Sequence, residues 1–302
     1  MKSILFLLVI FLLSLSVNLF AEIQGNVSSD IWTADGNFGL SGKHSTYNNS
    51  WKTKHSSDST YLSFNSCLLE VKYNQALSAD FSLAQGLIQK QNMSVKAYNS
   101  AGSLSDSSYG KAEGRSHLGN QVLYFGLLGK NSEASSVLDV GVGYLTLSQN
   151  INYKNPTIVF DAMTPANNNM SFTETWQKYR IRAGGASFQL KEQLKVNDAL
   201  LLKLTLGYAP RVNARYVSTH LPNRAVSQQK QEHFDSDGTA IQYDIRMNYF
   251  FTNRFSAILG YKYISIKTSG ESETNIYPMW ASGDNDMDIS AKGIIFGLAC
   301  SF

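Results

Sequence analysis

One stretch of the sequence alternates so regularly that it constrains the fold more than any other. From Gly238 to Phe255, one set of alternate positions is apolar and the set between them is mostly polar. The apolar set is Ile241, Tyr243, Ile245, Met247, Tyr249 and Phe251, and the other set is Gln242, Asp244, Arg246, Asn248 and Phe250. This period predicts a β-strand with one apolar face. The aromatics beside the turn at 251–255 are typical of the interface girdle of a membrane strand.

Composition supports strands and narrows the classes of partner. The 302 residues include 16 Tyr, 16 Phe and 22 Gly, which favours strands and tight turns. Charged residues make up 16% of the chain and the formal net charge is +3. A nucleic-acid-binding protein usually carries much denser positive charge, so we expect no nucleic-acid partner.

The first 21 residues predict a signal peptide. Lys2 precedes an apolar run from Ile4 to Val17, and Ala21 is a small residue suited to the last position before cleavage. The apolar run is shorter than the ~20 residues that a membrane-spanning helix needs. Residues 22–302 are therefore expected to form a single exported domain.

The exported part divides into ten segments of strand-like alternation. Short turns join some of them, and long loops rich in Ser, Asn and Gly join the others. The expected strands are approximately 31–43, 60–73, 79–97, 120–128, 136–152, 173–190, 199–216, 238–251, 255–269 and a last strand that ends at Phe302.

This regular alternation of connection lengths predicts an all-β fold, a transmembrane antiparallel up-and-down β-barrel of ten strands. Its location would be the outer membrane of a Gram-negative cell. Four short turns would face the periplasm and five long loops the cell exterior, whereas a soluble Greek-key protein would not separate its connections so regularly. Strands longer than the ~9–11 residues that cross a bilayer predict a barrel that projects outward from the membrane.

The alternation also assigns residues to the two faces of the barrel wall. On the strand 199–216, the residues expected to face lipid are Leu200, Leu202, Leu204, Leu206 and Tyr208. Charges are costly in lipid, and ten strands leave a narrow lumen, so we expect charged residues to fill the lumen as pairs. The expected inward set is Glu70, Lys72, Asp139, Lys178, Arg180, Arg182, Lys203, Arg211, Asp244, Arg246 and Lys262.

The two cysteines test this topology. Cys67 and Cys300 would lie on strands separated by the first strand, about 9.6 Å or more apart. A disulfide needs Cα atoms within about 7 Å, so we expect two free thiols that face lipid. The closing strand, with Phe302 at its end, resembles the signal that directs barrel proteins to outer-membrane assembly.

Short motifs along the whole exported chain resemble the omptins, the family of ten-stranded outer-membrane barrels that includes aspartate/histidine endopeptidases. The motifs are Phe38-Gly39-Leu40-Ser41-Gly42-Lys43, Ser105-Asp106-Ser107-Ser108, Glu232-His233-Phe234, Asn248-Tyr249-Phe250-Phe251-Thr252 and Gly297-Leu298 with Phe302. Their order and spacing carry the resemblance, which implies an omptin-like barrel.

The resemblance also suggests where a catalytic site would be. Omptins place an Asp-x-Asp pair in the second long loop and an Asp-x-His pair in the fourth, which together deprotonate a water that attacks the peptide bond. Here His233 matches the histidine, but Gln231 stands two residues before it, and residues 98–104 contain no aspartate. The candidate catalytic residues of a rearranged site are therefore His233, Glu232 and Asp106, with Asp235 as a further acid.

Other motifs add little chemistry. The run Asp284-Asn285-Asp286-Met287-Asp288 alternates oxygen ligands, but it lacks the Gly and Glu of an EF-hand, which favours a solvated acidic loop over a calcium site. We expect no metal and no cofactor, with lipopolysaccharide as the one candidate for a bound lipid. Arg180 and Arg182 resemble basic positions that omptins use with lipopolysaccharide phosphate, although their expected inward direction favours ion pairs in the lumen.

Three functions fit these observations. The first is a non-proteolytic surface barrel that binds an extracellular partner through its loops. The second is a small porin-like channel, and the third is an omptin-type endopeptidase with rearranged acidic residues. In each case the partners include outer-membrane lipid and lipopolysaccharide.

Overall fold

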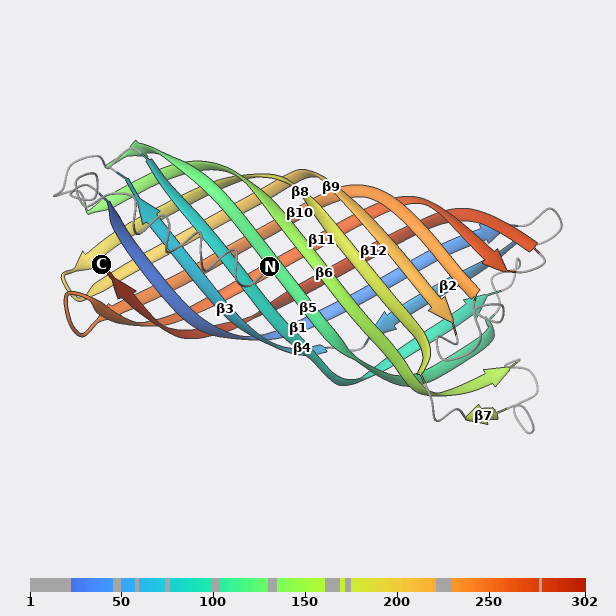
Figure 1. Cartoon of the computed structure of the whole chain (residues 1–302). Helices are drawn as coiled ribbons and strands as arrows, with labels where there is room; N and C mark the ends of the chain where they lie inside the picture. Colours follow the sequence, from blue (N-terminus) through green and yellow to red (C-terminus); the bar gives the residue numbers. More distant parts are fainter. Residues whose placement is uncertain are drawn as a thin grey trace, which may run out of the picture.

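Long antiparallel strands form a single closed wall around a narrow lumen (Figure 1). The computed structural model describes residues 23–45, 50–57, 60–73, 77–98, 104–129, 135–160, 169–171, 175–220, 230–276 and 279–302. Its strands are β1 (Gln24–Ser45), β2 (Ser50–Ser57), β3 (Thr60–Lys72), β4 (Leu77–Tyr98), β5 (Leu104–Leu128), β6 (Ser136–Phe160), β7 (Asn169–Ser171), β8 (Thr175–Asn197), β9 (Leu200–His220), β10 (Lys230–Phe250), β11 (Phe255–Ile276) and β12 (Met279–Ser301).

The ring has ten positions. β2 and β3 lie end to end and together occupy one position of the ring, between β1 and β4. The short strand β7 pairs with β6 and is not a position of the ring. The wall closes where β12 pairs with β1, and there Gly25 and Phe302 exchange two backbone hydrogen bonds of 2.9 Å. The prediction of an antiparallel up-and-down barrel is confirmed.

The strands are strongly inclined because their register shifts around the ring. Each residue has a paired residue on the neighbouring strand, and these pairs can be followed around the ring. A path that starts at Asp235 of β10 goes once around the barrel and returns to β10 at Met247, twelve residues after its start. For ten strands this stagger corresponds to a tilt of roughly 40°. Figure 1 shows the same inclination on the visible face of the barrel.

An apolar band surrounds the half of the barrel near the short turns. On β10 the band runs from Ile241, which is 52% exposed, to Phe251 in the turn that follows, which is 57% exposed. At that tilt these eleven residues span about 25 Å of height, the thickness expected for an outer-membrane barrel. The predicted lipid-facing residues Leu206 and Tyr208 are exposed on this band, and Cys67 and Cys300 are free thiols.

The predicted long loops are mostly strand, which corrects the sequence-based boundaries. β5 begins at Leu104 rather than near residue 120, β9 continues to His220, and β10 begins at Lys230 rather than Gly238. The error has a physical cause: above the membrane the outer face of each strand meets water, so a polar sequence there remains compatible with a strand. The predicted outward projection is the result of these extensions.

Above the band the outer face of the wall becomes polar and the inner face becomes apolar. Part of the predicted inward set is therefore wrong. On β8 the outward residues are Phe188 and Leu190 in the band but Arg180 and Arg182 above it, while Ile181 is buried inside. The inward prediction is therefore wrong for Arg180, Arg182 and, on the same face, the half-buried Lys178. It is also wrong for Arg211, whose side chain is 76% exposed, because a register irregularity in β9 between Ala209 and Val212 changes which residues point outward.

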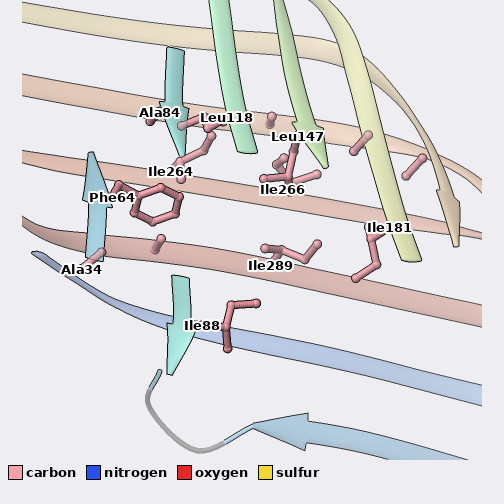
Figure 2. Close-up of a cluster of buried hydrophobic side chains, with 14 of the residues drawn as sticks. Ala34, Phe64, Ala84, Ile88, Leu118, Leu147, Ile181, Ile264, Ile266 and Ile289 are labelled. Carbon is pink, nitrogen blue, oxygen red and sulfur yellow. The ribbon is translucent and has the colours of Figure 1, made fainter. Parts of the chain in front are cut away.

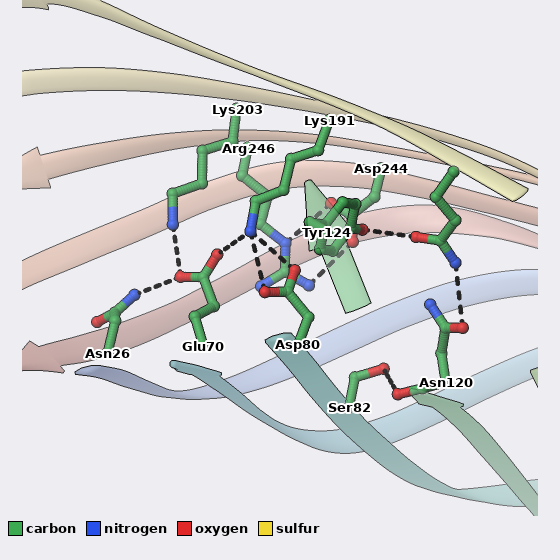
Figure 3. Close-up of polar contacts among 11 residues, drawn as sticks. Asn26, Glu70, Asp80, Ser82, Asn120, Tyr124, Lys191, Lys203, Asp244 and Arg246 are labelled. Carbon is green, nitrogen blue, oxygen red and sulfur yellow. Dashed lines mark hydrogen bonds and ion pairs between the residues drawn. The ribbon is translucent and has the colours of Figure 1, made fainter. Parts of the chain in front are cut away.

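Paired charges fill the lumen at the level of the band, as predicted (Figure 3). The Lys191 side chain is 4% exposed and lies 2.9 Å from Glu70 and 2.8 Å from Asp80. Lys203 pairs with the other Glu70 oxygen at 2.5 Å. A second group joins Arg246 to Asp30 at 2.7 Å and to Asp244 at 2.9 Å, with Lys262 beside them. The interior space among these residues is a cavity of only about 50 Å³.

An apolar core fills the lumen beyond the paired charges (Figure 2). Its side chains come from strands on every side of the ring, and Trp32 stacks on Phe64 with ring centroids 4.6 Å apart. The labelled members in Figure 2 are Ala34, Phe64, Ala84, Ile88, Leu118, Leu147, Ile181, Ile264, Ile266 and Ile289. The upper barrel thus resembles a water-soluble protein, with its core inside and its charges outside.

No helix among the described residues has the length and apolar character needed to cross a membrane. The predicted signal peptide at 1–21 lies outside the described residues.

Lys191→Met tests the paired charges. Methionine cannot neutralise Glu70 and Asp80, so the substitution leaves buried carboxylates without their shared cation and should destabilise the barrel by about 3 kcal/mol. Urea unfolding in detergent micelles, followed by tryptophan fluorescence, measures the change. The matched control is Lys267→Met, whose side chain is 70% exposed and pairs with Asp288 at 3.6 Å. That control should change stability by less than about 0.5 kcal/mol, and equal effects from the two variants would contradict the account.

Candidate functional site

The candidate site is a cluster of inward side chains near the outer end of the lumen, which we call the outer cluster. It consists of Gln177 and Tyr179 of β8, Tyr216, Ser218 and His220 of β9, Glu232 of β10 and Asn285 of β12. Glu232 lies nine residues before Ile241, the upper end of the apolar band on β10, so the cluster is outside the membrane.

Gln177 connects the polar members of the outer cluster. Its side-chain oxygen accepts a hydrogen bond from the Tyr179 hydroxyl at 2.8 Å, and its nitrogen donates to Ser218 at 2.5 Å. The same nitrogen is 3.0 Å from Nε2 of His220, so Nε2 is an acceptor when the amide donates to it. Gln177 is only 1% exposed, which fixes these partners in place.

Aromatic rings enclose the cluster from below. Tyr179 and Tyr216 lie 5.9 Å apart by ring centroid, and Phe234 meets Tyr216 edge-on at 6.4 Å. All three side chains are almost fully buried. Burial also raises the pKa of the Tyr179 and Tyr216 phenols, since a phenolate would lose its hydration there.

Glu232 is the carboxyl group of this site. It is 8% exposed and accepts a hydrogen bond of 3.4 Å from the side-chain nitrogen of Asn285. Burial raises the pKa of Glu232 to about 7, and the Asn285 bond opposes that rise only partly. A carboxyl that exchanges its proton near neutral pH has the property required of a general acid or base.

The structure separates the residues that the sequence grouped as a catalytic set. Glu232 points into the lumen, whereas His233 is exposed on the outer face of β10, so the two cannot orient one water molecule. Asp235 is exposed on the same outer face as His233 and lies 3.7 Å from Arg215. Asp106 belongs to β5, but its side chain lies outside the described residues.

Sequence reasoning missed most of the outer cluster. Gln177 and Tyr179 alternate with Lys178 and Arg180, and this pattern could have placed the first pair inside if the upper barrel had been treated as water-exposed. His220 and Asn285 had been assigned to loops, and each lies in a strand that continues beyond the predicted end. The acidic residues Asp284, Asp286 and Asp288 are also in β12 and exposed; among the described residues, no three His, Cys, Asp or Glu side chains are placed to hold a metal.

A second feature lies on the outer surface just above the apolar band. Arg182, Arg211 and Arg215 line a groove of about 700 Å³, together with Tyr144 at the edge of the band. Arg211 lies 3.3 Å from Asp237, and both side chains are more than half exposed. This groove presents three guanidinium groups, two of which pair with the carboxylates of Asp235 and Asp237, at the height of lipid headgroups.

Comparison with known proteins supports the fold. No family model and no curated protein matches the chain. Among solved structures, the outer membrane protease OmpT from Escherichia coli is similar, with a TM-score of 0.65 and 10% identity over 91% of this chain and 96% of that chain. The outer membrane protein OprG from Pseudomonas aeruginosa matches with a TM-score of 0.38 and 12% identity, over 92% of this chain and 95% of that chain. The toluene transporter TodX from P. putida matches with a TM-score of 0.32 and 8% identity, over 93% and 90%.

The fold, the apolar band and the structural similarity to OmpT define the class of protein. The protein is a β-barrel of the outer membrane, and its fold resembles that of OmpT.

The pKa of Glu232 predicts a pH dependence of stability. The folded protein holds this proton up to about pH 7, whereas the unfolded chain releases it near the ordinary value of 4.5. Stability should therefore fall as the pH rises between these values, by at most about 3 kcal/mol, and stay at the lower level above them.

Urea unfolding in micelles at pH 5 and pH 8 measures this change. Glu232→Gln should flatten the dependence, while Glu271→Gln, at an exposed carboxyl on β11, should leave it unchanged. A wild-type protein as stable at pH 8 as at pH 5 would contradict the assignment.

Proposed function

We propose that this protein is an omptin-like surface barrel without protease activity, and that it binds an extracellular partner at its outer end. The filled lumen is the observation that carries the proposal. Paired charges and an apolar core occupy successive levels of the barrel, which weighs against a channel. His233 and Glu232 lie on opposite faces of β10, which weighs against the rearranged catalytic site that would use both.

The outer end is the part of the molecule that a partner could reach. The strands continue well above the apolar band, so they carry their connections away from the membrane surface. Exposed charges of both signs cover the upper wall, such as Arg180 on β8 and Asp284 on β12. Mixed exposed charge of this kind favours a polar partner whose own charges are complementary.

Two assays on one preparation test the proposal. The purified barrel, refolded with lipopolysaccharide, should give no single-channel steps in a planar bilayer and should not cleave a peptide library. Heat-modifiable gel mobility confirms that the sample is folded. Discrete conductance steps would refute the closed lumen and favour a porin-like channel.

The outer cluster favours one second candidate, a protease centred on Glu232. Its pKa near 7 suits a general base, and His220, rather than His233, is the histidine of the cluster. If peptide cleavage is observed, this candidate predicts that Glu232→Gln and His220→Ala abolish it while His233→Ala retains it. Loss of cleavage in His233→Ala would instead support the site expected from the family motif.

We also propose that lipopolysaccharide phosphate binds in the groove lined by Arg182, Arg211 and Arg215. Guanidinium groups form paired hydrogen bonds with phosphate, and these three are exposed just above the apolar band. Tyr144, at the edge of the band, would contact the lipid below the headgroup.

Neutralising the groove tests this contact. Added lipopolysaccharide should raise the Tm of the wild type in micelles, and the triple variant Arg182→Gln, Arg211→Gln, Arg215→Gln should lose most of that rise. Arg254→Gln, in the turn at the opposite end of the barrel, is the matched control and should keep it. An undiminished rise in the triple variant would exclude the groove as the binding site.

A further inference from the structure

Exposed charges above the apolar band are segregated by sign around the outer face of the barrel. The cations, which we call the basic wall, are Lys111 and Arg115 of β5 and Lys178 and Arg180 of β8. The anions, which we call the acidic wall, are Glu271 of β11 and Asp284, Asp286 and Asp288 of β12. β9 and β10 lie between β8 and β11, so the two walls face different directions around the ring.

Ion pairs within the chain leave most of these charges uncompensated. Glu113 lies between Lys111 and Arg115, but Lys154 of β6 pairs with it. Lys267 pairs with Asp288 at 3.6 Å, and both side chains are more than half exposed. The other members of the two walls form no ion pair with another residue in the described part of the chain.

The segregation is costly for the sheet itself. Glu271 and Asp284 are matched directly across β11 and β12, and like charges in that position destabilise a sheet. In the same way, Lys111 of the basic wall is matched with Lys154. Alternating signs would be more stable, so charges of the opposite sign from outside the chain would stabilise both walls.

The two walls lie at the same height above the membrane. Phe188 and Ile294 are the first large apolar residues of the band on β8 and β12, and they are 59% and 47% exposed. Arg180 lies eight residues above Phe188, and Asp286 lies eight residues above Ile294. At the rise and tilt of these strands, both charges are about 20 Å above those apolar residues.

Membrane insertion turns this agreement in height into a contact geometry. Every copy of the barrel has its short turns on the same side of the membrane, so neighbouring copies are parallel and differ only by rotation about the membrane normal. Some rotations place the basic wall of one copy opposite the acidic wall of the next, with the charges at matching heights. The apolar bands below give little preference between a protein and a lipid neighbour, so the charged walls determine which sides meet.

The acidic wall fits a protein neighbour better than a lipid. Lipopolysaccharide carries phosphate, which the carboxylates of this wall repel. A groove of about 470 Å³ lies along the wall and is lined by Asp286 and Asp288, which gives room for a long cationic side chain. Arg115 and Arg180 are exposed side chains of that kind, and a guanidinium binds a carboxylate through two hydrogen bonds.

We propose that copies of this protein associate side by side in the membrane, with the basic wall of one copy against the acidic wall of the next. Each contact leaves one wall free on either copy, so the association can continue into a row or close into a ring. The contact is on the side of the barrel and is independent of the partner bound at the outer end. It also uses none of the groove residues Arg182, Arg211 and Arg215.

Energy transfer between labelled copies measures this association. Dyes are attached at Asn253→Cys, in the exposed turn after β10, in a chain that carries Cys67→Ser and Cys300→Ser. The protein is refolded into preformed phosphatidylcholine vesicles, so that all copies insert from one side and no lipopolysaccharide is present. Mixed donor and acceptor copies should show transfer above that of a random distribution. About 1 M salt should remove most of it, because the Debye length falls to about 3 Å.

Charge reversal tests the pairing of the two walls. An acidic variant, with both walls negative, carries Lys111→Glu, Arg115→Glu, Lys178→Glu and Arg180→Glu. A basic variant, with both walls positive, carries Glu271→Lys, Asp284→Lys, Asp286→Lys and Asp288→Lys. Each variant alone should associate at least about tenfold more weakly than the wild type, because like charges would face each other. Donor-labelled acidic variant mixed with acceptor-labelled basic variant should regain the transfer.

The control reverses two exposed charges at the opposite end of the barrel, Lys195→Glu and Arg254→Glu, and should keep the transfer of the wild type. Heat-modifiable gel mobility verifies the fold of each variant. Random-level transfer in the wild type, undiminished transfer in either reversed variant, or no recovery in their mixture would overturn the proposal. Loss of transfer when lipopolysaccharide is added to the vesicles would assign the basic wall to lipid instead, and would overturn it as well.

Discussion

The backbone of a membrane-spanning sheet has no water to complete its hydrogen bonds, and the rest of this structure depends on that constraint. Every N–H and C=O group in the apolar band must pair with a neighbouring strand, so the sheet has to close. Pairing of β12 with β1 achieves this and fixes the register around the whole ring. The twelve-residue stagger then sets the tilt, and ten tilted strands set a lumen narrow enough for side chains from opposite walls to meet.

What fills that lumen changes with height, and the outer surface changes with it. Within the band the wall is apolar outside and charged inside, with Lys191 and Arg246 as the central cations. Above the band the same strands are charged outside and apolar inside, as Arg182 and Ile181 show on β8. Both arrangements follow from one rule, that apolar groups avoid water. Lipid surrounds the wall in the band, and water surrounds it above the band. The inward groups of the outer part, Glu232 among them, therefore lie in a protein core.

The alternation of side chains, together with the alternation of short and long connections, was enough to predict the architecture, because in the band each side chain's character reveals its face. The part of β10 within the band was placed correctly for this reason, although the strand begins earlier, at Lys230. Above the band the rule reverses, so Arg180 and Arg182 were assigned to the lumen and Gln177 was missed. The candidate site was predicted less well: Glu232 was selected, but only as a substitute acid beside His233, which alternation puts on the other face. His220 could be found only once β9 was known to extend to it. Asn285 of β12 meets Glu232 of β10 although β11 lies between their strands, a proximity that no local pattern reveals.

The seam between the first and last strands also governs when the protein can become a barrel. Asn26 is matched with Ser301, so the partners of the seam are separated by nearly the whole chain. None of these pairs can form until β12 has been synthesised and exported, and until then β1 exposes a free edge to the periplasm. Such an edge can pair with any other strand. A chain whose last strand is still missing therefore keeps an unpaired edge, and only the closure of this seam removes it.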